Sequence, residues 1–71
     1  MDRAILREHL DQSRHRAAMG EHHFAPQERL IAELDRDGHD TTGAVSVLAS
    51  LTRTQELHEL DIERLLRDLA E

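Results

Sequence analysis

The sequence contains no cysteine, tryptophan, tyrosine, asparagine or lysine, and it has one phenylalanine and one proline. Without cysteine, a disulfide framework and a thiolate zinc site are both excluded. With a single aromatic side chain among 71 residues, the chain can build only a thin core. A domain of this size then depends on regular helix packing, on a metal or on a partner chain.

Long apolar runs are also missing, so no segment is expected to cross a membrane. The chain begins Met1-Asp2-Arg3, and charges interrupt its first residues too early for a signal peptide. The lack of cysteine fits a reducing compartment. We therefore expect a cytoplasmic protein without a membrane partner.

Acidic residues outnumber basic ones and give a formal net charge of −6. Such a surface repels nucleic acid unless the basic side chains are segregated. Several arginines lie near the amino terminus, but Asp2, Glu8 and Asp11 are interleaved with them. We predict a solvated helix face with ion pairs between residues four apart, and no nucleic-acid partner.

The second half of the chain keeps a strict spacing of four and three residues. This spacing places its members on one stripe of an α-helix, which must face another helix. We expect this helix over about residues 41–69, with the stripe formed by Ala44, Leu48, Leu51, Gln55, His58, Ile62, Leu65 and Leu69. Further apolar residues lie outside the stripe and widen the apolar surface, namely Val45, Val47, Leu57, Leu60 and Leu66.

The first half holds two seven-residue series that are offset by three positions. One series is Leu10, Ala17, Phe24 and Ile31, and the other is Leu6, Ser13, Gly20, Gln27 and Leu34. The constant phase favours one long helix over about residues 3–37, kinked at 20–26 because glycine and proline both weaken a helix interior. The alternative leaves residues 20–25 as a loop and starts a new helix with Pro26 in its first turn, which gives a three-helix bundle.

A turn separates the two halves at Gly38, His39 and Asp40. Glycine suits the left-handed residue that closes a helix, and Asp40 or Thr41 can cap the next one. His39 can interact favourably with the carboxyl end of the first helix. Because connections this short join antiparallel neighbours, we predict a single all-α domain over residues 1–71, folded as an antiparallel helical hairpin.

Folding at this turn sets Ile31 near Leu48 and Gly20 near His58. In the middle of the seam we predict a polar layer that fixes the register, formed by Gly20, Gln27, Gln55 and His58. The predicted core and interface residues are Leu10, Phe24, Leu30, Ile31, Leu34, Val47, Leu48, Leu51, Leu57, Leu60, Ile62, Leu65, Leu66 and Leu69.

Six histidines are the main chemical feature: His9, His15, His22, His23, His39 and His58. No two of them are three or four residues apart, as metal ligands on one helix usually are. The chain also lacks a glycine-rich phosphate loop and a nucleophile elbow. We therefore predict no enzymatic activity, no cofactor and no metal.

The apolar surface exceeds what one hairpin can hide. We expect an interaction module that dimerises into a four-helix bundle, or that binds a helix of another protein. The alternative function is a binding protein that responds to metal or pH through histidine. For the pH response His58 is the main candidate, because it lies on the apolar stripe, where a positive charge would loosen the core.

The run from Pro26 to Thr41, with its Arg-Asp-Gly-His-Asp-Thr turn, resembles a family of small proteobacterial proteins of unknown function. The pattern from Ala44 to Leu65 resembles the second half of the same family. The resemblance covers about residues 17–66, and the turn motif is its most specific part. It implies two amphipathic helices joined at the turn and no known activity, and this chain departs from it at Pro26.

Overall fold

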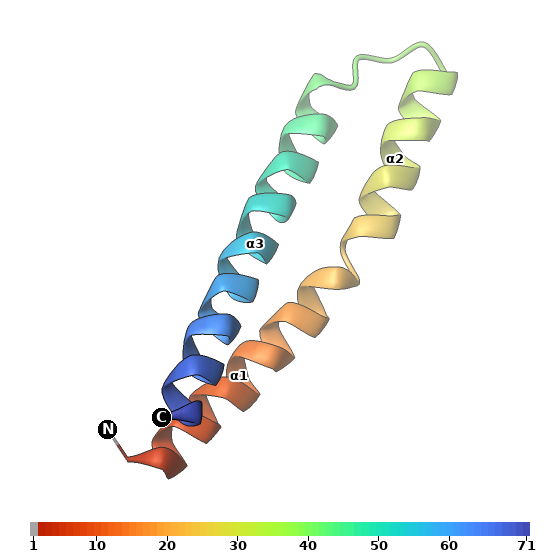
Figure 1. Ribbon diagram of the computed structural model, residues 1–71. Helices are drawn as coiled ribbons and strands as arrows, with labels where there is room; N and C mark the ends of the chain where they lie inside the picture. The colour runs from red at the N-terminus through yellow and green to blue at the C-terminus, as the bar shows by residue number, and fades with distance from the viewer. Residues whose placement is uncertain (1) are drawn as a thin grey trace.

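The computed structural model describes residues 2–71. Within this range the chain forms three helices and no strand: α1 (Arg3–Glu21), α2 (Phe24–Arg36) and α3 (Thr42–Ala70). Helices α1 and α2 follow one another with a bend, and α3 runs back alongside both of them (Figure 1). The all-α prediction is therefore confirmed.

The break between α1 and α2 consists of two residues, His22 and His23. Their backbone N–H groups donate to the carbonyl oxygens of Met19 (3.2 Å) and Gly20 (3.1 Å), which closes the end of α1 with a tighter turn. Pro26 lies in the first turn of α2, where its missing N–H removes no helical hydrogen bond. The predicted long helix is thus broken inside its predicted kink at 20–26, and the loop over 20–25 of the alternative is reduced to these two residues.

The connection between α2 and α3 begins with a helix C-cap built on Gly38. Its φ of 74° lies in the left-handed region, which residues other than glycine rarely adopt. The Gly38 N–H donates to the Asp35 carbonyl oxygen (3.1 Å), and the His39 N–H donates to that of Leu34 (2.8 Å). These two bonds form a Schellman motif, which satisfies carbonyls that the end of α2 would leave free.

The start of α3 is held by Asp40. One carboxylate oxygen accepts hydrogen bonds from the Thr42 backbone N–H (2.9 Å) and from the Thr42 hydroxyl (2.7 Å). Thr41 occupies the N-cap position but supplies no side-chain hydrogen bond of its own. The capping oxygen therefore comes from the residue before it, and it satisfies one of the free N–H groups of the first turn.

The buried apolar core of the described residues is small and lies where α1 meets the carboxyl half of α3. It consists of Leu6, Leu10 and Leu65, with Ile62 and Leu69 packed against it. The other predicted seam residues are half-buried: Phe24, Ile31, Leu34, Leu48 and Leu51. The predicted residues that stay exposed are Leu30, Val47, Leu57, Leu60 and Leu66.

The molecule is a thin rod with principal extents of 54 × 14 × 13 Å. Its radius of gyration is 16.5 Å, whereas a compact domain of this length has a radius of about 11 Å. In residues 2–71, two layers of helix thus lie side by side, and no third layer covers their outer faces.

Candidate interaction surface

In the described part of the chain, three side-chain hydrogen bonds join α3 to α1 and α2. Ser13 Oγ donates to Asp61 Oδ2 (2.8 Å), and it is the most deeply buried polar group of the described residues. Gln55 Nε2 donates to the Ala17 carbonyl oxygen (2.8 Å). Gln27 Nε2 donates to the Ala44 carbonyl oxygen (2.9 Å). Each bond satisfies a polar group in the seam, and together they fix how α3 is aligned with α1 and α2.

The predicted polar residues do not form one layer. Gln27 bonds to α3 at Ala44, whereas Gln55 bonds from α3 to Ala17. Ala44 and Gln55 are about 16 Å apart along α3, since a helix rises 1.5 Å per residue. His58 is half-buried, and no hydrogen bond of its side chain is found among residues 2–71. The polar groups therefore act at separate levels of the seam.

Gly20 packs against Gln55 instead of the predicted His58. A Cβ atom at Gly20 would overlap the Gln55 side-chain oxygen. Because glycine has no side chain, the Gln55 amide lies directly over it and reaches the Ala17 carbonyl. The predicted pairing of Gly20 with His58 is therefore wrong. Gly20 faces Gln55, which lies three residues, or about one turn of α3, before His58.

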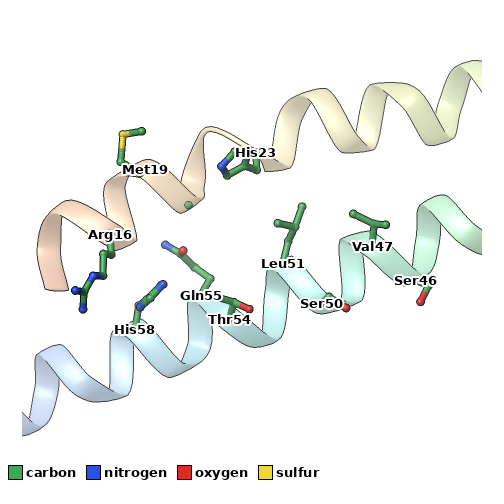
Figure 2. Close-up of a pocket in the computed structure, with 11 residues that line it drawn as sticks. Arg16, Met19, His23, Ser46, Val47, Ser50, Leu51, Thr54, Gln55 and His58 are labelled. Atoms are coloured by element: carbon green, nitrogen blue, oxygen red, sulfur yellow. The ribbon is translucent and has the colours of Figure 1, made fainter.

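A groove of about 430 Å³ opens where α1 ends and the chain bends away from α3. Figure 2 shows Gln55 directed from α3 toward α1, with Arg16 and His58 facing the same space. The described residues that line the groove include no aspartate or glutamate, although the chain has 15 of them. Its lining comprises Arg16, Met19, Gly20, His23, Ser46, Val47, Ser50, Leu51, Thr54, Gln55 and His58.

The most exposed large apolar side chains of the described residues lie on α3. Leu57 and Leu60 are 58% and 59% exposed, and they line two shallow depressions together with polar residues such as Arg53 and Arg64. Val47 is 49% exposed and lines the groove. Leu30 and Leu66 are also exposed, so the five predicted interface leucine and valine residues all remain uncovered in one copy of the chain.

The charged groups form few specific sites. Arg64 pairs with Asp61 at 2.6 Å on the surface of α3, and an exposed pair of this kind contributes at most about 1 kcal/mol.

The Thr42 hydroxyl and then the Thr42 N–H hold the pKa of the Asp40 carboxyl below its ordinary value of 3.8. Among residues 2–71, no group of three or more potential metal ligands comes together.

Sequence reasoning did not single out two residues that the structure buries, Leu6 and Ser13. The signal was present, since both belong to the series that continues through Gly20, Gln27 and Leu34. Taken together, the two seven-residue series give one four–three stripe from Leu6 to Leu34, and every member of it is buried or half-buried.

Comparison with protein-family models, with curated proteins and with solved structures finds no match to this chain. In the part of the chain that the structure describes, no helix combines the length and the apolar character needed to cross a membrane.

Proposed function

We propose that this chain is a helical interaction module that associates with a second copy of itself. The observation that carries this proposal is the surface area of one copy, which is 5447 Å². A compact monomer of 8.2 kDa exposes about 4,500 Å². The excess is about 900 Å², close to the roughly 800 Å² that each partner contributes to a stable protein interface.

The thin core supports the same conclusion. Three apolar side chains are buried in residues 2–71, and none of the described side chains is completely enclosed. A single core in a chain of this size supplies about 3–5 kcal/mol at most. Covering Leu57, Leu60 and Val47 with a second copy adds about 25 cal/mol for each Å² of apolar surface that is removed from water.

The arrangement that follows is two antiparallel helical hairpins packed into a four-helix bundle. Such a bundle gives each long helix two neighbours and surrounds its apolar residues. A two-layer rod with one uncovered side is half of this architecture. The proposed activity is association itself, without catalysis.

Sedimentation equilibrium from low to high micromolar concentration tests the proposal. We expect a mass of two chains, together with a melting temperature that rises with protein concentration, because dimerisation stabilises the folded chain by mass action. Circular dichroism on the same samples reports helicity. A monomer at tens of micromolar that remains fully helical and melts independently of concentration would contradict the proposal.

A further inference from the structure

The groove between α1 and α3 gathers hydrogen-bond donors in a chain that is otherwise strongly acidic. Arg16 reaches the groove from α1, His23 from the break after α1, and His58 from α3. Figure 2 shows the Arg16 and His58 side chains directed into the same space from the two helices. No described residue of the lining is aspartate or glutamate, although the formal net charge of the chain is −6. A negatively charged group in this groove therefore meets a cation without facing a carboxylate in its walls.

The guanidinium of Arg16 has no acidic partner among residues 2–71. Its neighbours three and four positions away on α1 are all uncharged: Gln12, Ser13, Met19 and Gly20. Asp61 shares an adjoining depression with Arg16 and is three positions from His58. However, both of its carboxylate oxygens are engaged, since Oδ2 accepts from Ser13 (2.8 Å) and Oδ1 pairs with Arg64 (2.6 Å). Arg16 thus keeps its donors available to a ligand.

Apolar side chains continue the groove away from these donors. Leu51 lies seven residues before His58, which is about 10 Å along α3. Met19 is 52% exposed and lines the groove from α1. The groove volume of about 430 Å³ falls within the range of about 300–1,000 Å³ that small-molecule sites occupy. One end rich in donors and one apolar end together suit an amphipathic anion.

We propose that this groove binds an aliphatic carboxylate. The carboxylate lies between Arg16 and His58, and the hydrocarbon chain lies along Leu51 and Met19. A guanidinium presents two parallel N–H groups that match the two oxygens of a carboxylate, and the imidazole can donate a further N–H. A head group with a single charge is favoured over a dianion, because the negative charge of the whole chain repels a second charge more strongly.

The proposed site is formed within one copy of the chain and goes beyond the proposed self-association. Its contacts on α3 run from Leu51 to His58, so Val47, Leu57 and Leu60 stay available to a second copy. We therefore expect the ligand to bind a monomer and a dimer alike. Failure of either proposal leaves the other standing.

Calorimetric titration of the full chain with octanoate tests the inference. We expect saturable binding with one octanoate per chain. Octanol has the same hydrocarbon chain without the charge, and it should bind at least about tenfold more weakly because a charge-assisted hydrogen bond is lost. Butanoate has the same head group and a shorter chain. It should also bind at least about tenfold more weakly, since each methylene that is removed from water contributes about fourfold.

Two arginines of α1 give a matched pair of variants. Arg16 lines the groove, whereas Arg14 does not. Because two positions turn a helix by about 200°, Arg14 points to another side of α1. We expect Arg16→Gln to weaken octanoate binding about tenfold or more. Arg14→Gln changes the net charge by the same amount and should leave binding unchanged. Circular dichroism of both variants checks that they remain helical.

Three results would each overturn the proposed site. The first is the absence of saturable binding at millimolar octanoate. The second is octanol binding as tightly as octanoate, which would mean that the groove takes up an apolar chain without recognising the carboxylate. The third is equal weakening by Arg14→Gln and Arg16→Gln, which would mean that only the net charge of the chain matters.

Discussion

At the scale of single residues, the alignment of the seam depends most on Gln55. Its amide donates to the Ala17 carbonyl oxygen across the interface, and this contact is possible because Gly20 leaves room for it. Gln55 is buried, and a buried amide that loses its partner costs about 1–3 kcal/mol. A glycine near the end of α1 is thus explained by packing rather than by flexibility.

A double-mutant cycle between Gly20 and Gln55 measures this contact. In the wild-type background, Gly20→Ala should destabilise the fold by about 1 kcal/mol, because the new methyl displaces the hydrogen-bonded amide and this outweighs the gain in helix propensity. In a Gln55→Ala background the same change should stabilise by about 0.5–1 kcal/mol. Urea unfolding at one fixed protein concentration measures all four proteins, and strictly additive effects would contradict the packing.

At the scale of helices, specific residues at the helix ends determine where each helix begins and ends. The carboxyl end of α2 is closed by Gly38 in its left-handed conformation, and the amino end of α3 is held by Asp40. The break at His22 and His23 lets Pro26 occupy the first turn of α2. The stripe nevertheless continues in phase across the break, because both helices must turn the same side toward α3.

The Asp40 cap predicts a pH dependence of stability. The pKa of Asp40 is lower in the folded chain than its ordinary value of 3.8, so the cap contributes fully above that pH. Its contribution is lost as the pH falls through the lowered folded pKa. We expect Asp40→Ala to melt below the wild type at neutral pH, and the difference in melting temperature to shrink as the solution is acidified below pH 3.8.

Asp40→Asn is the control for this measurement. Asparagine keeps an oxygen that can accept from Thr42 but does not titrate. The difference in melting temperature between Asp40→Asn and Asp40→Ala should therefore be the same in acid as at neutral pH. A wild-type advantage over Asp40→Ala that stays constant down to the lowest pH would show that the charge of the carboxylate plays no part.

At the scale of the whole molecule, net charge opposes the proposed association of two copies. Each copy carries a formal charge of −6, so two copies repel each other at long range. Salt screens this repulsion, with a Debye length that falls from about 30 Å at 0.01 M to about 8 Å at 0.15 M. We expect the dimer dissociation constant to fall several-fold over this range, as measured by sedimentation equilibrium. A constant that rises with salt would indicate an interface held by ion pairs instead.

The sequence by itself determined the helical class, the turn at Gly38 and the set of residues on each stripe. These features depend on local chemistry, namely the 3.6-residue repeat of the helix and the conformational freedom of glycine. Treating the two series as one stripe would also have identified Leu6 and Ser13.

Only the tertiary structure decided which residues meet across the seam. Periodicity places Gln55 and His58 on the same stripe, but it does not show which of them reaches Gly20. It also does not locate the break between α1 and α2 or the groove beside Val47. These features depend on distances between residues that are far apart in the chain, and such distances are set by how side chains of different length fill the space between helices.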